Sequence, residues 1–200
     1  KTSVIQQLRM ISPDYLELIH RLDKETSGIL MLAKTREALL AMHSQLQAPN
    51  SRQRMKKVYQ ALLCGRWRGK SRTVNRPLET IRPKIGEKRS QVSKTGRFAQ
   101  STFSPIELFQ NFSLLEIMLA TGRLHQIRAH ASAEGMPVAG DKIYGEKKQN
   151  KALRRIGLTR QFLHASGVSF HHPTTKEAIS VQSPLPASLL SVLTQLREEA

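Results

Sequence analysis

Several kinds of residue are scarce in this chain of 200 amino acids. A single cysteine, Cys64, excludes an internal disulfide and any zinc site built from several thiolates. A reducing, cytoplasmic setting is therefore expected. No apolar run approaches the roughly 18 residues that indicate a membrane span, so we expect no membrane partner. The chain also lacks the glycine-rich loop that cradles nucleotide cofactors, and we expect no cofactor.

Acidic residues are also scarce. The chain has 15 of them against 32 Lys and Arg, which gives a formal net charge of +17. The excess is concentrated between Arg52 and Arg97, where 15 basic residues face only Glu79 and Glu87. Such a segment indicates a polyanionic partner and favours a nucleic acid, whose phosphates supply affinity. A membrane surface is the weaker alternative because no basic amphipathic helix contains this charge.

Aspartate is rarer still, since only Asp14, Asp23 and Asp141 occur. Asp23 lies in the segment HRLDKETSGILML, on a short turn between two apolar stretches that are typical of strands. A lone carboxylate on such a turn, in so basic a protein, indicates a reactive group in a basic cleft. An opposite charge within about 4–6 Å favours the ionised form of a carboxylate. Arg21 and Arg128 are both candidates for this partner.

The distribution of apolar residues predicts a single α+β domain with a mostly antiparallel sheet. Thr35 is expected to cap a helix that ends at Pro49-Asn50. The basic residues 66–100 are expected to form hairpins or an extended loop with short strands, on the RNA-facing side. Helices are predicted at 4–11, 36–47, 123–133 and 186–199, and strands at 16–22, 29–33, 58–64, 100–109, 112–120, 166–170 and 178–182.

Five motifs resemble, in the same order, those of the RluA family of pseudouridine synthases. They are HRLDKETSG from residue 20, KVYQALLCG from 57, GRLHQIRAH from 122, GDKIYG from 140 and FLHA from 162. The match covers nearly the whole chain. It implies the pseudouridine synthase fold, in which a mixed, mostly antiparallel sheet is flanked by helices and forms a catalytic cleft.

Two departures from the family pattern stand out. The family usually has threonine where this chain has Leu124, which leaves Arg128 in register. The family's upstream Lys-Pro motif and the S4 RNA-binding domain of many members are not found in residues 1–200. We therefore expect this chain to be the catalytic domain of the enzyme, with both features upstream of it.

The resemblance implies isomerisation of uridine, in which the N1–C1′ bond breaks and C5 bonds to C1′. Asp23 is the implied catalytic residue, and either attack on C1′ or removal of the C2′ proton fits the sequence. Arg128 is implied as its salt-bridge partner. Tyr59 is expected to stack beneath the uracil and to help remove the C5 proton. Asp141 and Tyr144 are expected to brace the loop around the site.

Other residues are expected to bind RNA. The target base cannot react inside a stack and must be flipped out. By resemblance Arg21 fills the vacated space, with a guanidinium that both stacks and hydrogen-bonds, and Leu163 packs against the base or simply in the core. His125 and Gln126 are also assigned to RNA binding. Trp67 either stacks on a base or caps the edge of the sheet.

We therefore expect an RNA pseudouridine synthase that acts on 23S ribosomal RNA as a monomer. A transfer RNA substrate is one alternative. A non-catalytic RNA-binding or ribosome-assembly module is the other, although the combination of Asp23, Tyr59 and Arg128 argues against it. No metal is expected, because His125 and His130 are five residues apart and make a poor pair of ligands on one helix.

Overall fold

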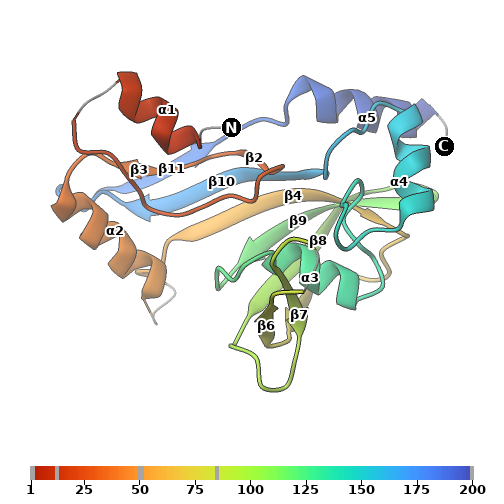
Figure 1. Cartoon of the computed structure of the whole chain (residues 1–200), viewed down its shortest axis with the longest axis horizontal. Coiled ribbons are helices and arrows are strands. Elements are labelled where there is room, and N and C mark those ends of the chain that lie inside the picture. Colours follow the sequence, from red (N-terminus) through yellow and green to blue (C-terminus); the bar gives the residue numbers. More distant parts are fainter. Residues whose placement is uncertain (1–2, 12–13, 49–51, 84–85, 199–200) are drawn as a thin grey trace.

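The computed structural model describes residues 3–11, 14–48, 52–83 and 86–198 (Figure 1). The helices are α1 (Val4–Ile11), α2 (Arg36–Gln47), α3 (Gln126–Ala133), α4 (Lys147–Arg155) and α5 (Ala187–Glu198). The strands are β1 (Glu17–Leu18), β2 (Ser27–Gly28), β3 (Leu32–Ala33), β4 (Lys56–Cys64), β5 (Arg72–Asn75), β6 (Leu78–Ile81), β7 (Arg89–Val92), β8 (Gln100–Leu108), β9 (Phe112–Leu119), β10 (Leu163–His171) and β11 (Ala178–Gln182).

A central sheet has the order β11-β10-β4-β9-β8-β5. All neighbours in this order are antiparallel, and the short strand β2 adds to β10 in parallel. Strands β6 and β7 form a separate hairpin that projects from the sheet beside α3 (Figure 1). The predicted α+β class with a mostly antiparallel sheet is confirmed. Within the described ranges, no helix is both long enough and apolar enough to cross a membrane.

Strand β4 is central and is covered on both faces. Successive side chains of a strand point to opposite faces of the sheet. Accordingly Tyr59, Ala61 and Leu63 pack in one hydrophobic cluster with Ile127 of α3. Leu62 belongs to a second cluster, which contains the buried side chains of α4 and α5. The two faces of β4 thus contact different parts of the chain, with α3 on one side and α4 and α5 on the other.

Helix α2 lies on the same face of the sheet as α3. Lys57 of β4 pairs with Val168 of β10, so these two side chains share a face, and that face also holds Tyr59. Val168 packs with Met42 of α2. Helices α2 and α3 therefore stand apart on one face of the sheet (Figure 1). The side chains of β4 between them line the floor of a pocket.

The predicted elements are mostly present, with changed lengths. Thr35 caps α2, and its hydroxyl accepts a hydrogen bond from the Ala38 amide at 3.1 Å. The predicted helix end at Pro49-Asn50 lies outside the described residues. The strand expected over 16–22 contains only Glu17–Leu18, and helix α3 begins three residues later than expected. Helix α4 was not predicted, because its nine residues are mostly charged and only Leu153 is buried.

The parallel pairing of β2 with β10 places the turn that contains Asp23 against the sheet. Gly28 sits there with φ +106°, and a Cβ on this residue would lie 2.2 Å from the Ala165 carbonyl oxygen. The next residue, Ile29, donates its amide to that same oxygen at 3.0 Å. Glycine is therefore required both by the backbone conformation and by the closeness of β10.

Replacing Gly28 with alanine should lower the free energy of unfolding by about 3 kcal/mol, because steric overlap adds to the strain of a positive φ. Gly69→Ala is the matched control, since Gly69 has φ +83° but nothing within 4 Å of its would-be Cβ. It should cost only about 1 kcal/mol. Urea denaturation of both variants measures the difference. Equal losses would show that the contact with Ala165 is not what requires glycine.

Candidate active site

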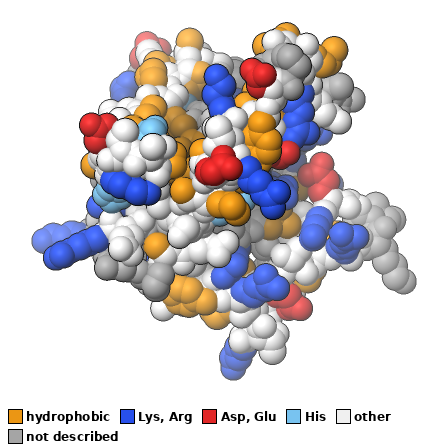
Figure 2. Space-filling model, turned by 90° about the vertical axis from the view of Figure 1, so that its left-hand side faces the viewer, with side chains coloured by type: hydrophobic (Ala, Val, Ile, Leu, Met, Phe, Trp, Pro, Cys, Tyr) orange, Lys and Arg blue, Asp and Glu red, His pale blue; other side chains and the backbone are white. Residues whose placement is uncertain are grey.

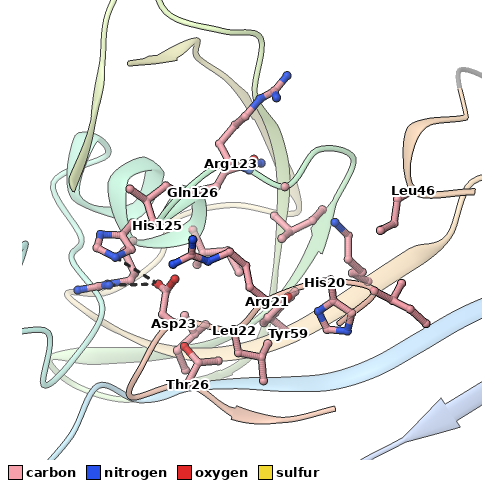
Figure 3. Close-up of a pocket in the computed structure, with 18 of the residues that line it drawn as sticks. His20, Arg21, Leu22, Asp23, Thr26, Leu46, Tyr59, Arg123, His125 and Gln126 are labelled. Carbon is pink, nitrogen blue, oxygen red and sulfur yellow. Dashed lines mark hydrogen bonds and ion pairs between the residues drawn. The ribbon is translucent and has the colours of Figure 1, made fainter. Parts of the chain in front are cut away.

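The pocket between α2 and α3 has a volume of about 350 Å³. Figure 3 shows Asp23 and His125 on one side of it, and His20 and Leu46 on the other. The floor comes from β4, β9 and β10, and the wall from α2, the Asp23 turn and the segment that leads into α3. Its lining residues include Ile19, Arg21, Leu22, Asp23, Thr26, Gln47, Lys57, Tyr59, Leu119, Gly122, Arg123, Leu124, His125, Arg128 and Leu163.

A chain of ionic contacts runs from the pocket into the protein. Arg128 donates from Nη1 to the Asp23 Oδ2 at 3.1 Å. Its other nitrogens form a two-point contact with Asp141, from Nε to Oδ2 at 2.6 Å and from Nη2 to Oδ1 at 2.9 Å. The side chain of Asp23 is 16% exposed, whereas that of Asp141 is fully buried. One side of the Arg128 guanidinium thus contacts Asp23, the catalytic candidate, and the other side is bound by the buried carboxylate of Asp141.

Asp141 is itself held by the backbone. Its Oδ1 accepts hydrogen bonds from the amides of Ile143 and Tyr144, at 2.8 and 3.0 Å. Burial acts to lower the pKa of Arg128, but the hydrogen bonds and charge of Asp141, with the charge of Asp23, raise it above the ordinary arginine value. The guanidinium carbon also lies 5.2 Å from the centre of the Tyr144 ring. Arg128 is therefore a permanently charged and tightly oriented group.

The turn that holds Asp23 is fastened to the start of β10. The Thr26 amide bonds the Asp23 carbonyl at 2.9 Å, which closes the turn. Arg160 donates to the Glu25 carbonyl at 2.9 Å and to the Ser27 hydroxyl at 3.0 Å. The two contacts of Arg160 join residues more than 130 positions apart, so the position of Asp23 depends on the second half of the chain.

Tyr59 and Leu163 form an apolar part of the floor. Tyr59 is 8% exposed and Leu163 is 3% exposed. Burial, and then the nearby negative charge of Asp23, raise the pKa of Tyr59 to about 12. The phenol therefore keeps its proton at neutral pH. A flat ring beside an aliphatic side chain is suited to holding a nucleobase by its faces.

His125 and Arg21 border the pocket near Asp23. His125 precedes α3 with a left-handed backbone, φ 49°, and its Nε2 lies 4.0 Å from the Asp23 Oδ2. Burial is the main cause that lowers the pKa of His125, which favours the neutral ring. The ring of His125 also stands edge-on against Tyr144. Arg21 is exposed, and in Figure 3 its side chain extends into the pocket.

Two residues assigned to RNA binding are engaged inside the protein. Gln126 lines the pocket, but it is buried and its amide group donates to the Gln100 carbonyl and accepts from the Arg123 amide, both at 2.9 Å. Trp67 is 3% exposed and its ring stacks on Phe103 in the core. Its indole nitrogen donates to the Lys70 carbonyl at 3.0 Å. The second interpretation of Trp67, in which it packs against the sheet, fits this position better than stacking on a base.

Sequence reasoning underrated the role of Asp141, which was expected only to brace a loop. Its rarity and its place in the motif GDKIYG were the available signals. Tyr144, from the same motif, accepts a hydrogen bond from the Ser90 amide and donates to its carbonyl, both at 2.8 Å. This ties hairpin β6–β7 to the site. Among the described residues, no group of three or more His, Cys, Asp or Glu is arranged to hold a metal ion.

Comparison with known proteins identifies the class. The family model described as RNA pseudouridylate synthase matches residues 2–133, and the chain belongs to this family. It is 39% identical over 198 residues to ribosomal large subunit pseudouridine synthase C of Pasteurella multocida, and 37% identical over 198 residues to that of Escherichia coli K12. These alignments cover 98% and 97% of this chain but only 60% and 61% of the relatives, so the chain spans about three fifths of their length.

Solved structures agree on the fold. The human RNA pseudouridylate synthase domain containing 1 superposes with a TM-score of 0.73 at 25% identity, over 97% of this chain and 83% of the human one. The human domain containing 4 gives a TM-score of 0.74 at 21% identity, over 97% and 82% of the two chains. The expected pseudouridine synthase fold is thus confirmed.

Removing one partner of the buried contact between Arg128 and Asp141 should be strongly destabilising. Asp141→Asn removes the charge that compensates a buried guanidinium, so the free energy of unfolding should fall by about 3–5 kcal/mol. Glu107→Gln is the matched control, because Glu107 makes the same two-point contact with Arg197, at 2.8 and 2.7 Å, on the surface. It should cost less than about 1 kcal/mol. Similar losses in urea denaturation would contradict the importance of burial.

Proposed function

We propose that this chain is the catalytic domain of an RNA pseudouridine synthase that isomerises uridines in 23S ribosomal RNA. The observation that supports it best is the linked set of Asp23, Arg128 and Asp141 beside a pocket with an aromatic floor. The relatives named above are large-subunit ribosomal enzymes by name, which favours ribosomal RNA over transfer RNA. Action on ribosomal RNA would place the protein in the cytoplasm.

The pocket suits one flipped nucleotide. Its volume of about 350 Å³ lies within the range of small-ligand sites. A uracil ring placed between Tyr59 and Leu163 would bring its ribose toward Asp23, and the exposed Arg21 at the pocket edge could occupy the space left in the RNA stack. The cost of flipping is then offset by stacking inside the pocket and by contacts to the RNA backbone.

Asp23 would act on the ribose. In the overall reaction the N1–C1′ bond breaks, the C5–C1′ bond forms, C5 loses its proton and N1 gains one, so no cofactor is consumed. The carboxylate can assist either by attacking C1′ or by removing the C2′ proton. Both routes need a carboxylate that is ionised and oriented. The hydrogen bond from Arg128 supplies that orientation.

The binding surface for RNA would extend from the pocket along hairpin β6–β7. A second pocket opens on the other side of Asp23 and is lined by Thr80 of β6, by Lys88 before β7 and by Lys24 of the Asp23 turn. The segment from Arg52 to Arg97, which includes this hairpin, holds most of the excess positive charge. Figure 2 shows Lys and Arg side chains projecting from several edges of one side of the molecule. Such a surface attracts the RNA backbone without reading its sequence.

Asp23→Asn should abolish isomerisation while leaving the fold intact, since the amide fills the same space without the charge. The deciding experiment maps pseudouridines in 23S ribosomal RNA from cells that lack the gene and are complemented with wild type or Asp23→Asn. Wild type should restore the lost modifications and the variant should restore none.

Asp14→Asn provides the matched control, because Asp14 is exposed and does not line the pocket. It should complement like wild type. Full restoration by Asp23→Asn would remove Asp23 from catalysis. If deletion changes no site in ribosomal RNA but removes one from transfer RNA, the substrate assignment is wrong.

Tyr59→Phe tests whether the hydroxyl acts in addition to the ring. A phenol with a pKa of about 12 is protonated at neutral pH, so it can accept the C5 proton only if its own proton moves on at the same time. Losing a proton-transfer group typically slows a reaction by at least about 100-fold. We expect that loss in single-turnover rate, with RNA affinity within about twofold of wild type because stacking is retained. An unchanged rate would limit Tyr59 to stacking.

A further inference from the structure

Lys57 is a lysine on the pocket floor with no role in the chemistry above. It precedes Tyr59 by two residues on β4, so both side chains lie on the pocket face, about 7 Å apart along the strand. Its amine reaches the loop before α3, because a Cβ on Gly122 would lie 3.0 Å from the Lys57 Nζ. The side chain is half-buried among Leu119 and Val168, its partners on the neighbouring strands.

The amine of Lys57 has no partner in the part of the chain that the structure describes, where it makes neither an ion pair nor a hydrogen bond. Burial, and then the positive charge of Arg54, lower the pKa of Lys57 to about 8. His20, which also lines the pocket, is likewise a base, and its half-buried ring accepts a hydrogen bond from the Met31 amide at 3.1 Å. A half-buried lysine without a partner is unusual, and it indicates a site for an anion.

We propose that Lys57 binds a phosphate of the RNA strand next to the flipped nucleotide. This inference rests on the proposed function, because the flipped nucleotide is what brings a phosphate into the pocket. With the base against Tyr59 and the ribose at Asp23, the strand on either side of the flipped nucleotide passes along the pocket and brings its phosphates there. Lys57 stands one strand repeat from Tyr59. The charge of Asp23 acts on the pKa of Tyr59, whereas the charge that acts on the pKa of Lys57 is that of Arg54. The amine is therefore placed for a phosphate of the adjoining strand and not for the Asp23 carboxylate.

The pocket has two electrostatic parts. Asp23 and His125 lie on one side of it and His20 on the other (Figure 3). Lys57 also lines the pocket and makes no contact with a carboxylate there. An ammonium group is a compact point charge suited to a single phosphate oxygen. Gly122 keeps the space above the amine open, since any side chain there would crowd it. The base, its sugar and a phosphate of the adjoining strand would thus contact three different parts of the pocket.

The test measures binding of an unmodified 23S ribosomal RNA transcript at several salt concentrations, with Asp23→Asn as background so that the RNA stays unchanged. Lys57→Met should weaken binding roughly tenfold and reduce the slope of log affinity against log salt by about 0.7–1. Methionine matches the length of the stem and removes an uncompensated charge, so the variant should unfold at the same temperature or higher. A weaker affinity with an unchanged salt slope would show that Lys57 contacts an uncharged group and would overturn the proposal.

Two further variants separate this contact from general charge. Lys56→Met removes the same charge from the adjacent position of β4, where the side chain is exposed and points to the opposite face. It should change affinity and salt slope much less than Lys57→Met. Lys57→Arg keeps a cation in the pocket and should retain most of the salt slope. Equal effects of the two methionine variants would contradict a specific phosphate contact.

Protonation gives an independent readout. The phosphate contact requires the charged amine, so wild-type affinity should fall as the pH rises from 7 to 9, through the pKa of about 8. His20 does not account for this change, because burial lowers its pKa below the ordinary histidine value. Lys57→Met should therefore show a flatter profile than wild type, and Lys57→Arg should also be flat. If the affinity of both variants falls with pH as steeply as that of wild type, a group other than Lys57 is responsible for the pH dependence.

The source of the phosphate is tested with inorganic phosphate as competitor. At equal ionic strength it should displace no more RNA than chloride does. Selective displacement from wild type, but not from Lys57→Met, would indicate a site for free phosphate and overturn the assignment to RNA.

Turnover of the same transcript by the chain with Asp23 intact separates the two proposals. If turnover is present while the Lys57 variants behave like wild type, only the phosphate site fails; if no RNA is modified, the proposed function fails.

Discussion

The site depends on a buried arginine held between two aspartates. Arg128 contacts Asp141 through two nitrogens and Asp23 through the third, and only the Asp23 end faces the pocket. Burying these charges costs free energy that good geometry only partly offsets. The protein therefore gains orientation more than stability from this arrangement. Because Asp141 is held by backbone amides, it fixes the position of the Arg128 guanidinium and, through it, that of the Asp23 carboxylate.

The sheet determines which side chains can share the pocket with that carboxylate. Along β4, Lys57 and Tyr59 face the pocket, and Leu62 packs beneath the helices on the other side. A shift of one residue in the pairing of β4 would exchange the two faces and remove Lys57 and Tyr59 from the pocket. Long antiparallel pairing with β9, over eight residues, resists such a shift. The register of β4 thus determines which of its side chains line the pocket and which pack in the core.

Much of this architecture could be predicted from local patterns, and some of it could not. Apolar periodicity located most helices and strands, and the motif around Asp23 identified the catalytic candidate. The flanking arginines left the position of Trp67 open between stacking on a base and capping the sheet, and only the folded structure shows its ring packed on Phe103. The burial of Gln126 could not be predicted from its neighbours in sequence either, because its side chain bonds the carbonyl of Gln100, 26 residues away. Helix α4 was missed since a charged surface helix has almost no apolar stripe to detect.

Long-range pairing also explains why the predicted strands near Asp23 are so short. The stretches 16–22 and 29–33 alternate or run apolar, yet most of their residues contact other parts of the chain irregularly. Only two residues pair between β1 and β3, and only two between β2 and β10. Tertiary context overrides local propensity at such positions.

The attachment of the Asp23 turn to β10 has a consequence for biosynthesis. Ribosomes make proteins from the N-terminus, so Asp23 leaves the exit tunnel long before Arg160 and Ala165 exist. Until those residues arrive, the turn has neither its parallel strand nor its hydrogen bonds. A nascent chain would hold Asp23 unplaced until residues 160–165 have been made. The pocket around this aspartate is therefore completed only when segments more than 130 residues apart have both been synthesised.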